Sequence, residues 1–228
     1  MKVVVGKGTS SEQYLVAQTS LEELSDYFFN ALRRDTFKEG REGRLEFPED
    51  DGASWEVLLY WMLKKEVPPC IEQEDEILVR CWILGDKYGI AAFQDEIMIR
   101  LLAYWQESLV SVTAFAIAAD QCQPSSKLRQ LLVEEAAVAF LVETFDGEFS
   151  DAIDGRGWLK DIKHALRRYQ SSNKVFRGRF RRMESREKDE DPSKRPPIWK
   201  DYMVGNGPRL YWAFGRWIVL GEDLGQAQ

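Results

Sequence analysis

The sequence is poor in the side chains from which metal centres and acid–base sites are built. Its 228 residues include one histidine, His164, and three cysteines, Cys70, Cys81 and Cys122. The cysteines are odd in number and widely spaced, which fits neither a disulfide framework nor a Cys-x-x-Cys metal site. We therefore expect reduced, mostly buried thiols, with no bound metal ion or other cofactor.

The single histidine also has poor surroundings for catalysis. Lys160, Lys163 and Arg167 lie close to His164 in the sequence and would lower its proton affinity. Asp161 is the only acid spaced to orient the ring. We expect His164 on a solvated helix face and predict a protein that is not an enzyme.

Long apolar runs are missing as well. No run approaches the ~20 residues of a membrane span, and residues 3–5 are too short an apolar block for a signal peptide. The hydrophobic share of 44% is nevertheless enough to bury a core. The composition predicts a cytoplasmic or nuclear protein that has no membrane partner.

A phosphate-binding loop is absent despite the suggestive Gly6-Lys7-Gly8 near the N-terminus. A Walker A loop aligned on Lys7 would need its first glycine at Met1, and Gly8 stands where a hydroxyl residue should be. An apolar run precedes the glycines and another, 14–16, follows. This pattern predicts a hairpin turn between two strands.

The elements that are present predict an α+β fold. Ser20 and Glu23 form a capping-box pattern before an apolar stripe that reaches Leu32, which predicts one helix. Glu49-Asp50-Asp51 is expected to form a turn and a cap before a helix, and Gly89 is expected to end a helix at Tyr88. The other predicted elements are a strand over 44–47, helices over 52–64 and 92–105, and two packed helices over 108–141 separated by a break at 124–126.

Two stretches in this order resemble the BTB/POZ family, closest to its fungal group. They are YLVAQTSLEELSDYFFNALRRDTFKEGREGRLEFPEDDGASWEVLLYWMLKKEVPP and LVRCWILGDKYGIAAFQDEIM, and residues 125–141 are similar to a helix that follows the domain in many fungal members. The implied organisation is a BTB/POZ domain over 1–105, a helical extension over 106–170, a basic linker over 171–197 and an aromatic element over 198–228. Ala17 and Gln18 replace the family's His-Lys pair, and exchange of an upstream segment between partners is not expected.

The resemblance implies a protein-interaction module, often dimeric, without catalytic activity. Some members are substrate adaptors that dock on a cullin scaffold of ubiquitin ligases through an apolar-x-Glu motif, which Phe37-Lys38-Glu39 matches. A Phe can fill an apolar cleft and a Glu can pair with a basic rim. Tyr27 and Phe29, with Phe28, are candidate dimer aromatics, although we expect at least two of these three to pack inward.

Positive charge is concentrated in one segment. Residues 1–155 carry 14 Lys/Arg against 29 Asp/Glu, whereas residues 156–188 carry 12 against 3. Three interpretations stay open: a solvated linker, a contact with an acidic surface of this chain or a partner, and a nucleic-acid or nuclear-import patch. The patch would make the chain a nucleic-acid-associated regulator with the BTB domain as dimeriser, and its phosphate contacts would be Arg177, Arg179, Arg181 and Arg182.

The C-terminal part is rich in aromatic residues. Two such runs, 198–204 and 210–220, flank Gly205-Asn206-Gly207-Pro208, which predicts a hairpin-like element. Its six large rings, Trp199, Tyr202, Tyr211, Trp212, Phe214 and Trp217, are too many to leave in water. We expect them to fold back on the helical extension, the alternative being a docking surface for another protein.

Overall fold

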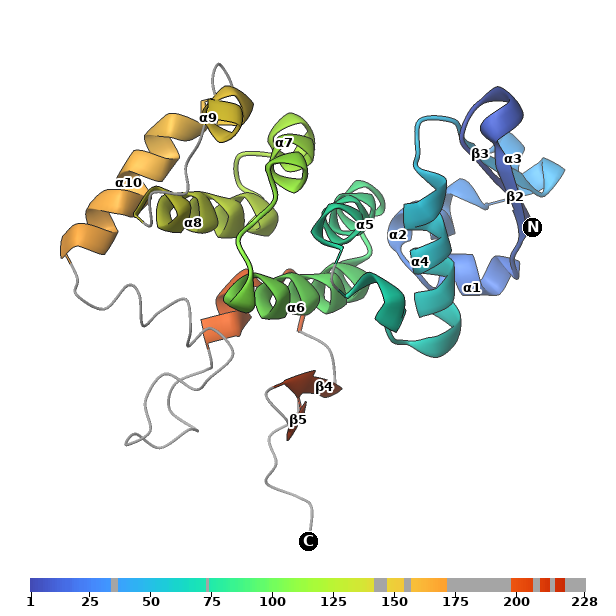
Figure 1. Ribbon diagram of the computed structural model, residues 1–228. Coiled ribbons are helices and arrows are strands. Elements are labelled where there is room, and N and C mark those ends of the chain that lie inside the picture. Colours follow the sequence, from blue (N-terminus) through green and yellow to red (C-terminus); the bar gives the residue numbers. More distant parts are fainter. Residues whose placement is uncertain are drawn as a thin grey trace, which may run out of the picture.

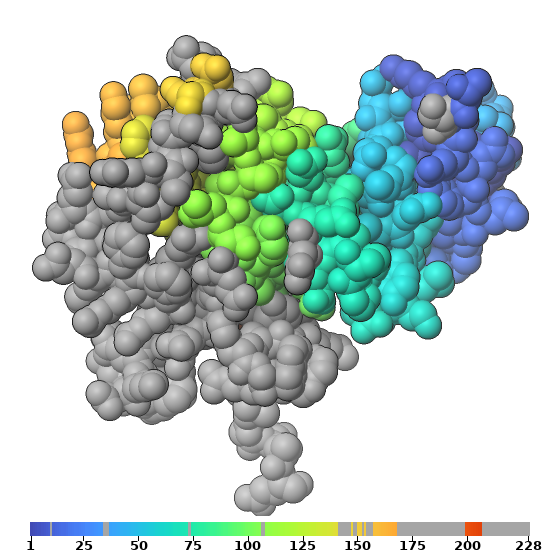
Figure 2. Space-filling view, in the orientation of Figure 1, coloured from blue at the N-terminus to red at the C-terminus, as the bar shows by residue number. Residues whose placement is uncertain are grey.

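The computed structural model has a small mixed sheet at one end and a series of helices beyond it, which confirms the α+β prediction (Figure 1). It describes residues 1–33, 37–72, 74–141, 147–153, 157–171, 198–206, 210–213 and 216–219. Helix α4 (Gly52–Lys64) packs against α5 (Asp75–Tyr88), and this contact joins the sheet end to the helices (Figure 2). No helix in these residues is long and apolar enough to cross a membrane.

The sheet contains three strands in the order β2-β1-β3. Strand β1 (Lys2–Val5) pairs antiparallel with β2 (Glu12–Leu15) and parallel with β3 (Arg44–Phe47). Gly6 and Gly8 in the connecting turn have φ angles of 84° and 61°, which favour glycine. The predicted hairpin turn and the third strand are therefore confirmed.

The predicted helix from Ser20 to Leu32 is wrong, because the chain forms two short helices. Helix α1 (Gln18–Glu22) starts before Ser20, and α2 (Asp26–Ala31) starts after Ser25. Ser25 is fully extended, with φ −166° and ψ 162°, so the apolar stripe turns a corner there. The bend lets both Leu21 and Phe28 reach the core, where each is fully buried.

The next helices follow their local end signals. The Asp51 carboxylate caps α4 by accepting a hydrogen bond from the Ser54 amide at 3.0 Å. Helix α5 ends at Gly89, which is left-handed, and the Ile90 amide donates back to the Gly85 carbonyl. Between them lies the short 3₁₀ turn η2 (Pro69–Ile71), and α6 (Ala91–Glu107) follows α5. The predicted bounds of α4 and the end of α5 are confirmed.

The described residues of the helical extension form four more helices. They are α7 (Val112–Gln121), α8 (Lys127–Leu141), α9 (Gly147–Ile153) and α10 (Trp158–Ser171). The break between α7 and α8 confirms the two predicted helices. The expected boundary at 105/106 falls inside α6, and one continuous core extends from the sheet through Trp82 and Trp105 to Trp158.

The C-terminal hairpin differs from the predicted one. Residues 198–202 form a 3₁₀ helix, η3 (Ile198–Tyr202), and the hairpin lies within the second run, between β4 (Leu210–Ala213) and β5 (Arg216–Val219). Trp199, Tyr202 and Met203 are buried, as the fold-back prediction required. The other four rings of that prediction, Tyr211, Trp212, Phe214 and Trp217, lie outside the residues whose side chains are described.

Candidate protein-binding surface

Three aromatic side chains are exposed near α2 and the loop that follows it. Tyr27 and Phe29 of α2 are 46% and 54% exposed, and Phe37, in the loop, is 46% exposed. The expectation that two of residues 27–29 face inward is wrong, because only Phe28 is buried. Successive residues on a helix point about 100° apart, so a short helix that buries Phe28 presents its neighbours at the sides.

The Phe37-Lys38-Glu39 sequence begins a short helix, α3 (Lys38–Glu42). Phe37 is its N-cap residue, and the Phe37 amide donates to the Arg33 carbonyl at 3.1 Å. Glu39 lies in the exposed first turn, and Lys38 pairs with Glu42 at 3.6 Å. The motif is thus held in a helical turn at the surface.

A glycine fixes α3 against the end of α2. Gly40 is buried, and a Cβ atom built on it would lie 2.5 Å from the Leu32 carbonyl oxygen. Only glycine permits this approach, which determines where Phe37 and Glu39 are displayed. The sequence alone offered no sign of this role, because a glycine in a polar stretch is more typical of a turn.

Tyr27 connects this motif with the core. Its ring lies 4.9 Å from that of Tyr88 and 5.2 Å from that of Phe28. Burial raises the pKa of the Tyr27 phenol, Lys87 opposes the rise, and the carboxylates of Asp50 and Glu39 add to it. Tyr27 and Glu39 therefore share one electrostatic neighbourhood, and with Phe37 we name them the α2–α3 surface.

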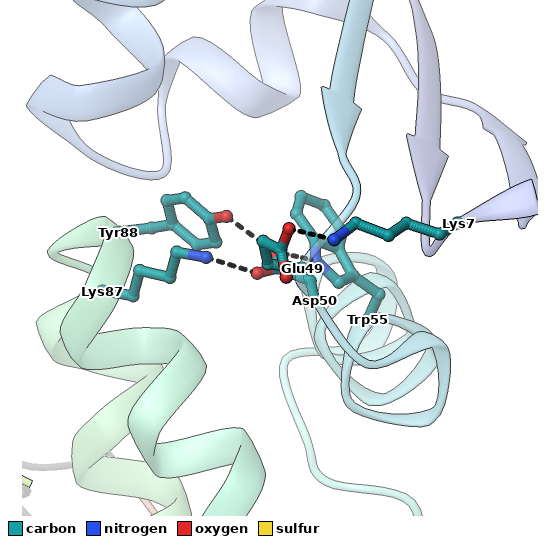
Figure 3. Close-up of polar contacts among 6 residues, drawn as sticks. All are labelled: Lys7, Glu49, Asp50, Trp55, Lys87 and Tyr88. Carbon is teal, nitrogen blue, oxygen red and sulfur yellow. Dashed lines mark hydrogen bonds and ion pairs between the residues drawn. The ribbon is translucent and has the colours of Figure 1, made fainter. Parts of the chain in front are cut away.

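Asp50 holds Tyr88, on whose ring Tyr27 packs, and Figure 3 shows Asp50 with the side chains that it binds. Its side chain is 3% exposed and accepts hydrogen bonds from Trp55 Nε1 at 2.8 Å and from the Tyr88 hydroxyl at 2.6 Å. Lys87 Nζ forms an ion pair with it at 2.5 Å. The carboxylate therefore joins the β3–α4 loop to α4 and to the end of α5.

The polar contacts around Asp50 stabilise the fold. Burial raises the pKa of the Tyr88 phenol, and the hydrogen bond to Asp50 raises it further, so the phenol stays a donor. The adjacent Glu49 pairs with Lys7 of the β1–β2 turn at the surface. The expected turn and cap at 49–51 is thus confirmed for Asp51, whereas the role of Asp50 was missed.

The other predicted features are scattered. His164 is exposed on α10, as expected for a solvated helix face. Cys81 is buried, Cys122 is partly buried and Cys70 is exposed; burial raises the pKa of the Cys122 thiol to about 12. Within the described ranges, no three His, Cys, Asp or Glu side chains are grouped to hold a metal ion.

Two groups of residues named in the sequence analysis remain: the Ala17-Gln18 pair and the arginines of the basic segment. Ala17 stands at the N-cap position of α1 without a side-chain capping bond, and the side-chain amide of Gln18 donates from Nε2 to Glu22 Oε1 at 2.7 Å. The Arg177, Arg179, Arg181 and Arg182 group lies outside the described residues.

The function has to be inferred from these residues themselves. A comparison with protein-family models, curated proteins and solved structures finds no match. Exposed rings beside a carboxylate, held by a glycine contact and a buried hydrogen-bond group, are suited to contact another protein.

Proposed function

We propose that this chain is a protein-interaction module of BTB/POZ type that has no catalytic activity and docks a partner through its α2–α3 surface. The observation that carries the proposal is Phe37, which is 46% exposed beside Glu39 although both sit on a fixed turn. A large exposed ring on a rigid support loses little entropy when it is buried in a partner.

The sequence resemblance gives the proposal its class of partner. The hairpin, the short helices, the third strand and the helices that follow occur in the order that the resemblance implies. By that resemblance, Phe37-Lys38-Glu39 is the motif that docks on a cullin scaffold of a ubiquitin ligase. The chain would then be a substrate adaptor.

The chemistry of the contact follows from the side chains. Phe37 fills an apolar cleft of the partner, and Glu39 pairs with a basic group at the rim of that cleft. Tyr27 lies near Glu39 and extends the contact. Phe29 is 54% exposed on the other side of the buried Phe28, which leaves it for a second copy of the chain if the module also dimerises.

Calorimetric titration with a cullin N-terminal domain tests the proposal. We expect the wild-type chain to bind, and Glu39→Lys to weaken binding at least tenfold because it places a cation against the basic rim. Glu66→Lys is the matched control, because Glu66 is exposed in the loop after α4 and the substitution makes the same charge change. It should bind as the wild type does.

The result that contradicts docking at this surface is equal affinity of the two charge variants. Thermal unfolding of both variants shows that each has kept its fold. Phe37→Ala provides an independent check on the apolar anchor, with an expected loss of at least tenfold.

A further inference from the structure

Helices α8 and α10 lie at the other end of the molecule from α2 and α3 (Figure 1), and a groove lined by charged and apolar residues lies between them. Its volume is about 770 Å³, and α8 and α10 pack side by side along it. Residues from the start of α8, the loop before it and one face of α10 line its walls. Five charged side chains are among the residues that line it: Arg129, Lys160, Asp161, Lys163 and Arg167.

The charge of this groove is opposite to that of the body. Lys160, Lys163 and Arg167 of α10 line it, and their spacing of three and four residues puts them on one helix face. None of the three forms an ion pair with another described residue. Residues 1–155, in contrast, carry 29 acidic against 14 basic side chains.

Arg129 supplies a fourth cation from α8. It is 8% exposed, and its guanidinium lies 4.1 Å from the centre of the Trp158 ring. It donates from Nη2 to Asp161 at 2.8 Å, which occupies the single carboxylate among the described lining residues. The Nε atom of the same guanidinium is buried and has no hydrogen-bond partner.

Apolar residues line the groove beside these cations. Leu159 is 46% exposed, and Val133 and Pro124 contribute to the same lining. A ligand that fits must offer negative groups along α10 and at least one apolar group beside them. An acidic peptide with interspersed apolar residues has this chemistry.

We propose that the α8–α10 groove binds an acidic peptide segment of a partner protein. The partner's carboxylates contact Lys160, Lys163 and Arg167, and one of its apolar side chains packs on Leu159. This second docking site does not depend on the α2–α3 surface, so either can fail in experiment while the other stands.

Nucleic acid fits the groove less well than a peptide. Apart from His164, no ring lines it among the described residues, so bases would find little to stack on. Trp158, the nearest large ring, is fully buried under Arg129. A long polyanion would also approach the acidic body at distances within the Debye length.

Fluorescence anisotropy with the full chain tests this site. The probe is a labelled twelve-residue peptide of Asp and Glu with two leucines. In the control peptide, Asn and Gln replace Asp and Glu, and the two leucines are kept. We expect binding of the acidic peptide alone, with an affinity that falls as salt is raised. Lys163→Glu should weaken binding about tenfold, and Leu159→Ala about fivefold.

The matched control is Lys64→Glu, an equal charge change at an exposed position of α4, which should leave the affinity as in the wild type. If Lys163→Glu and Lys64→Glu weaken binding equally, the proposal is overturned, because the affinity would then depend on the overall charge of the chain and not on this groove. Preferential binding of a single-stranded oligonucleotide over the peptide would overturn it as well. A third outcome would also overturn the proposal: the peptide binds only after the acidic residues of 187–191 are neutralised. The groove would then be occupied by an acidic segment of this chain and not by a partner protein.

Discussion

At the scale of single residues, Asp50 has the largest structural role that we find near the α2–α3 surface. One buried carboxylate accepts hydrogen bonds from an indole, a phenol and a lysine that belong to two helices. The four rings around it, Phe28, Phe47, Trp55 and Tyr88, pack with centroid distances of 4.7 to 6.3 Å. Loss of this acceptor leaves buried donors without partners.

Asp50→Ala should lower the free energy of unfolding by about 3 kcal/mol, because hydrogen bonds to a buried charge are lost together and two donors stay unpaired. Urea unfolding measures the change. The neighbouring Glu49→Gln is the control: its pair with Lys7 is solvent-exposed on both sides, so the expected loss is about 0.5 kcal/mol or less. Equal losses would show that Asp50 does not hold the loop in place.

Tyr88 gives a prediction for alkaline pH. Burial and Asp50 raise its pKa in the folded state above the ordinary tyrosine value, so above about pH 10 the unfolded chain binds fewer protons than the folded one. Stability is therefore complete below that pH and falls as pH rises. For one proton the slope approaches about 1.4 kcal/mol per pH unit.

Tyr88→Phe removes this contribution, so its stability should decline less steeply between pH 10 and 11.5 than that of the wild type. Urea unfolding at several pH values measures the slope. Parallel declines would contradict the assignment of the alkaline loss to Tyr88.

Sequence reasoning at this scale succeeded where partners are close along the chain. The turn and cap over 49–51 was predicted because these acids directly precede a helix, and Asp51 has its partner, Ser54, only three residues away. Asp50 could not be recognised, because Lys87 and Tyr88 follow it by 37 and 38 residues. Tyr27 and Phe29 were named as interface candidates. Their exposure depends on which of the three rings at 27–29 is buried in the core, and the sequence does not show that.

At the scale of elements, the helix ends that carry their own signals were predicted, and the corner between α1 and α2 was not. Gly89 and Asp51 act through bonds within one turn of their helices. The extended backbone of Ser25 has no such local cause, because it results from packing both Leu21 and Phe28 inward. The apolar positions were predicted correctly, but they lie on two helices and not on one continuous helix.

Gly40→Ala should lower the free energy of unfolding by about 2 kcal/mol, because the new methyl group would meet the backbone of Leu32 at 2.5 Å and push α3 away. It should also weaken partner binding, because Phe37 and Glu39 move with α3. Gly147→Ala is the control, since it has open space at the start of α9. The Gly147→Ala variant should be as stable as the wild type or slightly more stable. Wild-type stability and binding in Gly40→Ala would contradict the proposed positioning role.

At the scale of the whole molecule, a late segment of the chain is attached to the middle helices. Asp95 of α6 accepts hydrogen bonds from the Val204 amide at 2.6 Å and the Gly205 amide at 3.0 Å. Lys127 donates to the Asp201 carbonyl, and Tyr202 donates to Glu134. The fold-back was predictable from the number of rings, whereas the carboxylate that accepts its amides was not.

Asp95→Ala should release this attachment and speed tryptic cleavage after Lys200 severalfold, because the Val204 and Gly205 amides lose their acceptor. The rate is followed by mass spectrometry of the peptides. Asp151→Ala, at an exposed position of α9, should be cleaved at the wild-type rate. Unchanged cleavage in Asp95→Ala would show that the attachment does not depend on this carboxylate.

The central claim, a protein-interaction module, is tested most directly by light scattering on the chromatographed full chain, alone and mixed with a cullin N-terminal domain. We predict one shared peak for the mixture, which Glu39→Lys separates into two. If the chain elutes with the 26.4 kDa mass of one copy in both runs, up to 100 μM, the account is contradicted.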